Sequence, residues 1–175
     1  ALGGRDPAHC RRVVTDAGPV VVKRLGAVRT DAEAEEHLAL LARIGGAPHA
    51  ALAAVVDGGL EVVDGRALRW VATRWVAGSS ARDVVDDGGM EPEGIVPIVH
   101  VLAQGLAHLH ARGVVHRDVS PGNVVLGSDG AAAAALIDYG HAVLLAGTAR
   151  PSAGVVGTPG YVAPEEVVHG REALS

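Results

Sequence analysis

Hydrophobic and polar positions follow two different patterns along this chain. The first half holds short runs of β-branched and apolar residues, separated by turns rich in Gly, Pro or Asp. These runs predict strands over 10–15, 20–25, 60–63 and 68–76, with a turn at Asp64 and Gly65 between the last two. Between the second and third runs, Leu38, Leu40, Leu41 and Ile44 recur at helical spacing. We therefore predict a helix there that starts after Thr30 and stops at Gly45.

A longer helix is predicted in the second half, over 95–112. Its apolar residues recur every three or four positions, as one face of an amphipathic helix requires. They are Ile98, Val99, Leu102, Leu106 and Leu109. Two short apolar strands follow, over 123–126 and 133–137, on either side of a turn. From 141 to 160 the chain shows little periodicity, which is typical of a functional lid or a disordered segment.

The change from strands to helices falls near residues 77–80. The run Ala-Gly-Ser-Ser at these positions has the composition of a connector. The sequence therefore predicts an α+β fold with two lobes, a strand-rich lobe over 1–76 and a helical lobe over 77–175.

Composition narrows the possible partners. The net charge of −5 argues against nucleic acids and anionic membranes, because both attract a basic face. The single cysteine, Cys10, cannot form an intrachain disulfide, which favours a reducing compartment. No signal peptide and no apolar stretch of the ~18 residues needed to span a membrane is present in the sequence. We expect this segment to be cytoplasmic and without membrane contact, and a tether elsewhere in a longer protein is compatible with that.

A few residue types are rare in the chain, and they gather in a few places. Lys23 is its only lysine and Asn123 its only asparagine, and Tyr139 and Tyr161 are its only tyrosines. A sequence this biased towards Ala, Gly, Val and Arg is expected to keep its rare residues where their chemistry is needed.

Three segments contain the other three rare residues, and Lys23 lies on a predicted strand upstream of them. The segments are His-Arg-Asp-Val-Ser-Pro-Gly-Asn at 116–123, Ile-Asp-Tyr-Gly at 137–140 and Gly-Thr-Pro-Gly-Tyr-Val-Ala-Pro-Glu at 157–165. Together they resemble the eukaryotic-like, bacterial-type serine/threonine protein kinases, which carry HRDxxxxN, DFG, APE and VAIK motifs. The resemblance implies a two-lobed kinase fold that is truncated after the APE motif. Residues 1–175 alone are then expected to aggregate and to show no activity.

The resemblance implies ATP and Mg²⁺ as cofactors and a role for each motif residue. Phosphoryl transfer needs charges fixed around the triphosphate, and Lys23 would pair with phosphate oxygens. Asn123 and Asp138 offer the hard oxygen ligands that suit Mg²⁺. Asp118 would orient the acceptor hydroxyl and take its proton. Arg117 would face an unpaired pocket until a phosphate arrives on the loop, with Thr148 and Ser152 as the expected acceptors.

The family also pairs its strand lysine with a glutamate of the following helix. Glu33, Glu35 and Glu36 are available. Glu36 shares a helical face with Leu40 and Ile44, so we favour it as the partner of the lysine.

The adenine site is expected along the strand over 68–76. In the family, main-chain groups read adenine, here the Arg74 carbonyl and the Val76 amide, and Thr73 would be the gatekeeper. Val21 would lie above the adenine ring and Val125 below it. Plain core packing is the alternative explanation for these apolar positions.

The sequence departs from the family pattern at four places. Gly3 and Gly4 are all that resembles the glycine-rich phosphate loop, and the strand before that loop is missing. Ser120 stands where serine/threonine kinases carry a lysine near the γ-phosphate. Tyr139 replaces phenylalanine and adds a hydroxyl that needs a partner or a water. Val21 replaces a smaller alanine.

Three functions compete at this stage. The leading one is ATP-dependent transfer of the γ-phosphoryl group to Ser/Thr hydroxyls of a protein substrate. A pseudokinase, or regulatory nucleotide-binding module, is the first alternative because of Ser120 and the poor glycine loop. A small-molecule phosphotransferase is the second, but the segment at 157–165 is a protein-kinase feature. Zinc is not expected, since the nine histidines accompany neither Cys pairs nor an HExxH motif.

Overall fold

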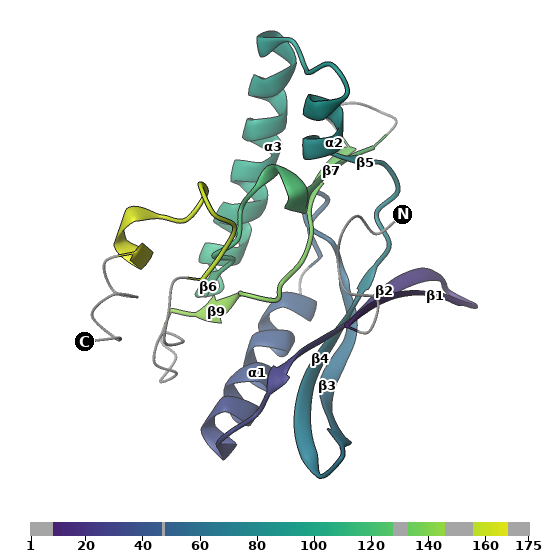
Figure 1. Ribbon diagram of the computed structural model, residues 1–175, viewed down its shortest axis with the longest axis vertical. Coiled ribbons are helices and arrows are strands. Elements are labelled where there is room, and N and C mark those ends of the chain that lie inside the picture. The colour runs from purple at the N-terminus through teal and green to yellow at the C-terminus, as the bar shows by residue number, and fades with distance from the viewer. Residues whose placement is uncertain (1–8, 47, 128–132, 146–155, 168–175) are drawn as a thin grey trace.

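The first group of elements is an antiparallel sheet with a helix against it (Figure 1). The computed structural model describes residues 9–46, 48–127, 133–145 and 156–167. The strands are β1 (Cys10–Thr15), β2 (Gly18–Ala27), β3 (Val55–Val63) and β4 (Arg66–Arg74), in the spatial order β1-β2-β4-β3. The helix is α1 (Asp31–Gly45), and it contacts β3 and β4. The four predicted strands and the helix of the first half are therefore confirmed.

The β3–β4 hairpin illustrates which boundaries the sequence predicts well. Asp64 and Gly65 both have positive φ, 50° and 73°, as a two-residue type I′ turn requires, and they are the predicted turn. The start of β3, by contrast, lies at Val55 rather than at Leu60. Gly58 interrupts the apolar pattern there. A Cβ on this residue would lie 2.8 Å from Leu41 of α1. This glycine makes the start of β3 hard to recognise in the sequence, and it also leaves room for α1 to pack closely against β3.

Helix α1 is fixed at its start and along its buried face. Thr30 caps it, with its Oγ1 accepting from the Glu33 amide at 3.2 Å, as predicted from the sequence. His37, Leu40 and Ile44 form the buried face. The His37 Nε2 lies 3.1 Å from the Gly59 carbonyl and 3.2 Å from the Trp70 carbonyl, so it donates to both strands beneath the helix.

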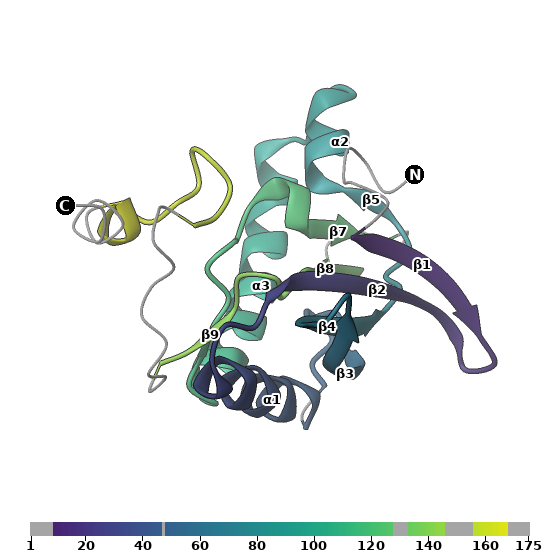
Figure 2. The same ribbon diagram turned by 60° about the horizontal axis from the view of Figure 1, so that its bottom comes forward.

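The second group of elements follows the connector at 77–80. It consists of β5 (Ser79–Ser80), α2 (Ala81–Asp86), α3 (Pro92–His110), β6 (Val114–Val115), η1 (Pro121–Asn123), β7 (Val124–Leu126), β8 (Ala134–Leu136) and β9 (Val143–Leu144). Strands β5, β7 and β8 form one small sheet, and β6 pairs with β9. Figure 2 shows α2, β7 and β8 of this group on one side of β2, and α1, β3 and β4 on the other.

Several details of this second group differ from the sequence prediction. Helix α3 begins three residues earlier than predicted and ends two residues earlier, at His110. Val99, predicted on its apolar face, is 57% exposed. Asn123 belongs to the 3-10 turn η1 and not to the strand after it. The sequence did not predict α2, β6 or β9, because elements of two to six residues carry too little periodicity to be recognised.

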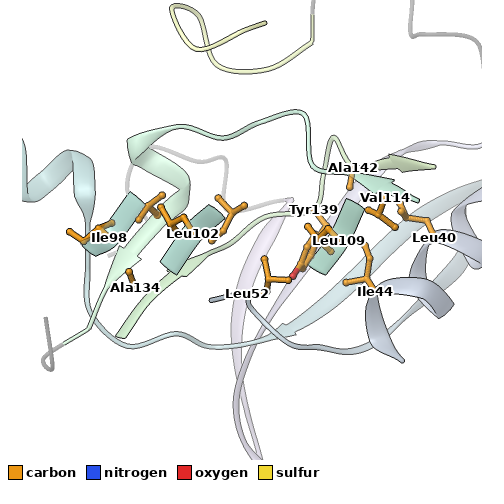
Figure 3. Packing of buried hydrophobic residues seen from close by; sticks show 12 residues of the cluster. Leu40, Ile44, Leu52, Ile98, Leu102, Leu109, Val114, Ala134, Tyr139 and Ala142 are labelled. Atoms are coloured by element: carbon orange, nitrogen blue, oxygen red, sulfur yellow. The ribbon is translucent and has the colours of Figure 1, made fainter. Parts of the chain in front are cut away.

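The hydrophobic core joins the two groups. It is built from residues of α1, α3, the small strands and the loops between them: Leu40, Ile44, Leu52, Ile98, Leu102, Leu109, Val114, Val124, Ala134, Leu136, Tyr139 and Ala142. Figure 3 shows Tyr139 and Leu109 close to Leu52 and Ile44. Leu136 is also tied to the segment before β3, since its amide donates to the Ala51 carbonyl and its carbonyl accepts from the Ala53 amide.

The lobe boundary at 76 stays a prediction. The four-stranded sheet lies within residues 10–74, yet the segment around Leu52 pairs with β8 of the second group. Within the described ranges, none of the helices combines the length and the apolar character needed to cross a membrane.

Candidate active site

A pocket of about 430 Å³ lies between the four-stranded sheet and the loops around β7 and β8. Its sheet side includes Val21, Lys23 and Thr73, and its loop side includes Asn123 and Asp138. Residues separated by more than a hundred positions in the sequence therefore meet in one cavity. Such a concave site with a few charged groups is the usual form of a small-molecule site.

Lys23 and Asp138 form an ion pair inside this pocket. Lys23 Nζ donates to both Asp138 oxygens, at 2.7 Å and 2.8 Å. The lysine side chain is 24% exposed and the aspartate side chain 5% exposed. Strand β2 holds the lysine by pairing Lys23 with Val71 of β4 and with Cys10 of β1. The ammonium and the carboxylate are thus held side by side at the position where a charged ligand would meet both.

The backbone around Asp138 is shaped for this contact. Asp138 has a φ of 74°, a left-handed conformation that few residues other than glycine adopt. Gly140, two residues after Asp138, donates its amide to Asp138 Oδ1 at 3.1 Å. A Cβ at Gly140 would lie 2.8 Å from Lys23 Nζ and 3.1 Å from Asp138 Oδ1, so a side chain there would displace the lysine ammonium from its present position. Strained backbone of this kind is common at functional sites.

Asp118 is the second carboxylate of the site, and three donors fix its position. Asn123 Nδ2 donates to its Oδ2 at 2.7 Å and to its main-chain carbonyl at 2.9 Å. Thr158 donates to its Oδ1 from the amide at 2.8 Å and from Oγ1 at 2.6 Å. Asp118 is only 9% exposed, and both of its side-chain partners line the pocket. The carboxylate is therefore preorganised immediately behind the cavity wall.

The Ser120 side chain is neutral, so it adds no charge to the pocket. It is 4% exposed, and its Oγ lies 3.2 Å from Thr158 Oγ1. Because the Thr158 hydroxyl proton goes to Asp118, Ser120 is the donor to Thr158. The serine thus extends the hydrogen-bond chain that ends on Asp118.

The asparagine and aspartate predicted to hold Mg²⁺ fit that role chemically. Asn123 and Asp138 both line the pocket, and their oxygen atoms are the hard ligands that Mg²⁺ prefers. The contacts of the Asn123 amide nitrogen with Asp118 fix the orientation of the whole amide. Among the described residues, this pocket included, no group of three or more His, Cys, Asp or Glu residues is placed to hold a metal.

His116 and Tyr139 support the loop from beneath. His116 is 1% exposed, and its Nδ1 accepts from the Asp118 amide at 3.4 Å. Burial lowers the pKa of His116 below its ordinary value, against the opposing effects of Asp138 and Asp118. Tyr139 is 3% exposed, and its hydroxyl donates to the Ala53 carbonyl at 2.8 Å. The partner that the sequence required for this hydroxyl is therefore a main-chain carbonyl of the segment before β3.

Replacing Tyr139 by phenylalanine is expected to lower the free energy of unfolding by about 1–2 kcal/mol, because the buried Ala53 carbonyl loses its donor. Urea unfolding of the two proteins measures this difference. Tyr161→Phe is the matched control, since Tyr161 is 52% exposed and its change should stay within about 0.5 kcal/mol. Equal stability of Tyr139→Phe and the wild type would show that the hydroxyl contact contributes nothing.

The expected adenine contacts lie along the same pocket. Val21, Arg74, Val76 and Val125 all line it, together with Thr73 and Trp75. The sheet already engages two amides of this stretch, since Arg74 donates to the Ala54 carbonyl and Trp75 to the Pro19 carbonyl. The Val76 amide lies just beyond the end of β4. Its role in reading adenine, like that of the Arg74 carbonyl, stays a prediction.

The partner of Lys23 on helix α1 also stays a prediction. The structure pairs Lys23 with Asp138. Among the candidate glutamates, Glu33 accepts from the Arg29 amide at 2.8 Å and so belongs to the start of the helix. Glu35 is exposed, whereas Glu36 is half-buried. Glu33 is half-buried as well, so these environments do not decide between Glu33 and Glu36.

One expectation about the roles of the site residues is wrong. Arg117 does not face an unpaired pocket, because its guanidinium forms two hydrogen bonds with the carboxylate of Glu166. The sequence could not show this, since Glu166 follows the APE motif and is 49 residues away. Four other predicted positions, Gly3, Gly4, Thr148 and Ser152, lie outside the described residues.

The structure adds residues to the site that sequence reasoning missed. Cys10, Ser80, Arg82 and Asp83 line the pocket. Ser80 and Asp83 are visible in the sequence as a helix start, and Ser80 does cap α2 by accepting from the Asp83 amide at 3.1 Å. Nothing in the sequence pattern places Cys10 or Arg82 in this cavity.

Comparison with known proteins adds independent information. The family model described as "Protein kinase domain" matches residues 58–174. The serine/threonine-protein kinase PkaB of Streptomyces coelicolor is 39% identical over 164 residues, which cover 86% of this chain and 37% of that protein. PknB of Mycobacterium leprae is 30% identical over 177 residues, covering 94% of this chain and 27% of that protein. The pak-1 kinase of Caenorhabditis elegans is 39% identical over 98 residues, covering 56% and 17%. The chain spans less than two fifths of the length of each of these relatives.

Proposed function

This chain belongs to the protein kinase domain family, and from that premise we propose that it transfers the γ-phosphoryl group of ATP to serine or threonine hydroxyls of proteins. The proposal is supported mainly by one observation, that two hydrogen-bonded side-chain pairs lie at the same pocket. Lys23 comes from strand β2, and the other three residues lie within 118–138, yet the Lys23–Asp138 pair and the Asp118–Asn123 pair lie at the same cavity.

Each of these residues has a definite part in the proposed transfer. The Lys23 ammonium donates to a phosphate oxygen, and the valines at 21 and 125 enclose the adenine ring. Asn123 and Asp138 would hold Mg²⁺, which when bound neutralises charge on the triphosphate. The family pairing of Lys23 with a helix glutamate is assigned to Glu36.

Asp118 acts on the acceptor. Its carboxylate accepts the hydrogen bond of the substrate hydroxyl and takes its proton as the new oxygen–phosphorus bond forms. The bond from the γ-phosphorus to the bridging oxygen breaks at the same time, and ADP leaves with that oxygen. Such transfer depends on positioning and charge more than on covalent help from the protein.

A second candidate function is a regulatory nucleotide-binding module with slow transfer. Ser120 favours it, because this hydroxyl faces Thr158 and adds no positive charge near the γ-phosphate. Deleting one such charged contact costs on the order of 2–4 kcal/mol of transition-state stabilisation. The two functions differ in a simple way, since a module of this kind binds ATP but leaves no phosphate on a protein substrate.

The Mg²⁺ assignment is tested by calorimetric titration of ATP with and without Mg²⁺. We expect the wild type to bind ATP more tightly with Mg²⁺, and Asp138→Asn to lower that gain about 10-fold or more, because loss of a group that only supports a metal ligand already costs about 10-fold in metal affinity. Asp86→Asn is the control, because Asp86 is exposed at the end of α2 and outside the pocket. Equal ATP affinity of the wild type with and without Mg²⁺ would rule out the roles given to Asn123 and Asp138.

A further inference from the structure

The side chain of Arg117 is paired with a carboxylate from a distant part of the same chain. Its Nε donates to Glu166 Oε1 at 2.8 Å, and its Nη2 donates to Glu166 Oε2 at 2.5 Å. This two-pronged geometry is the strong form of an arginine–carboxylate contact. The Arg117 side chain is 9% exposed and that of Glu166 28%. The guanidinium is thus largely removed from water, and Glu166 supplies the negative charge beside it.

A second contact joins the same two regions. Thr158 binds Asp118 through both its amide and its hydroxyl, at 2.8 Å and 2.6 Å. Gly157 precedes it with a φ of 118°, and a Cβ there would lie 3.0 Å from the Arg117 carbonyl. The segment 156–167 is therefore held at both of its ends by two consecutive residues, Arg117 and Asp118.

The two contacts, Arg117 with Glu166 and Asp118 with Thr158, are together called the clamp. The backbone conformation of Arg117 gives a further reason for it. Its φ is 64°, a left-handed conformation that is unfavourable for a residue with a long side chain. Such a conformation persists only where surrounding contacts hold it. The pair with Glu166 is one such contact, because it anchors the far end of the side chain.

We propose that Glu166 is a positioning residue, the built-in counter-anion of Arg117 that holds the segment 156–167 against Asp118 without a phosphate. The inference rests on the proposed function, since it concerns the geometry of the same catalytic carboxylate. A buried guanidinium without a counter-charge is strongly unfavourable, so Arg117 needs an anion. Glu166 already supplies one. A phosphate on the loop would have to displace this carboxylate before it could reach Arg117.

Hydrogen exchange of the full protein that carries this chain tests the clamp without relying on activity. Glu166→Gln keeps the size of the side chain but removes its charge. We expect amides of 157–166 to exchange about 10-fold faster in this variant, as for the loss of a charged hydrogen-bonded pair, with β2 and β4 unchanged. Glu61→Gln is the matched control, because Glu61 pairs with Arg24 at an exposed site in the sheet. Unchanged exchange in Glu166→Gln, with a melt like that of the wild type, would overturn the proposal.

A double-mutant cycle separates the pair from a general loss of stability. We expect Arg117→Gln and Glu166→Gln together to have nearly the effect of the more damaging single change, because either one breaks the same contact. Glu166→Asp, which keeps the charge, should recover part of the protection. Additive effects of the two glutamine substitutions would contradict a direct pairing.

Transfer assays on the same full protein then connect the clamp to function. We expect Glu166→Gln to lower kcat/KM for a protein substrate about 10- to 100-fold, as a misplaced reacting group does, with ATP affinity changed less than about twofold. Wild-type protein treated with a phosphatase should keep its activity, since Glu166 replaces the phosphate. Loss of activity after that treatment would overturn the proposal. No transfer from the wild type at all would instead refute the proposed function, and the exchange data would still decide the role of Glu166.

Discussion

Replacing Asp118 by asparagine is expected to lower the rate of phosphoryl transfer by about 10²- to 10⁴-fold, the range that a positioned general base contributes. An amide cannot take the proton of the acceptor hydroxyl. It also cannot accept at both ends, whereas Asp118 accepts from Thr158 at Oδ1 and from Asn123 at Oδ2. The substitution therefore removes the base and disturbs its support. Initial rates of transfer from ATP to a protein substrate measure the loss.

Two observations make this prediction specific to the chemical step. ATP affinity should change less than about twofold, because Asp118 lies behind the wall of the pocket rather than on it. Asp57→Asn provides a matched control on the exposed part of β3, and its rate should equal that of the wild type. Retention of at least half of the wild-type rate in Asp118→Asn would exclude the base role.

Replacing Lys23 by methionine is expected to lower transfer by at least about 10²- to 10³-fold, as when one preorganised donor is removed from developing charge. Methionine keeps much of the length of the side chain but cannot donate to phosphate. It also leaves Asp138, which is 5% exposed, without the ammonium that now lies 2.7 Å from it. Lys23 is the chain's only lysine, so no neighbouring ammonium can take its place.

Lys23→Arg distinguishes charge from geometry. The planar guanidinium keeps the positive charge but not the compact point-charge shape, so this variant should also lose most of its activity. Thermal melting serves as the check on folding for both variants. Transfer by Lys23→Met at a rate near that of the wild type would mean that the ion pair with Asp138 is only structural.

Much of the fold could be predicted because the local signals agree with the tertiary structure. Thr30 caps α1, and Asp64 and Gly65 form the turn between β3 and β4, as the sequence indicated. Helix α3 was less well defined. Its apolar residues extend around the helix, so periodicity alone did not show that Val99 is exposed while Leu109 is 1% exposed. That distinction depends on what packs against each face.

The candidate site, too, could be predicted from the sequence only in part. Rare residues in motifs led to Lys23, Asp118, Asn123 and Asp138, and the structure brings these four to one cavity or its wall. Contacts between distant segments could not be predicted. The Tyr139 hydroxyl reaches Ala53, 86 residues away, and no local pattern marks a main-chain carbonyl as a partner. The pairing of Arg117 with Glu166 was missed for the same reason.

The most direct test of this account is transfer of labelled γ-phosphate from ATP and Mg²⁺ to a protein substrate, by the full protein that carries this chain and by its Asp118→Asn variant. We predict label on serine or threonine of the substrate with the wild type, and about 10²- to 10⁴-fold less with the variant. Label that is absent with the wild type, or equal with the two proteins, would contradict the assignment of this pocket as a kinase active site.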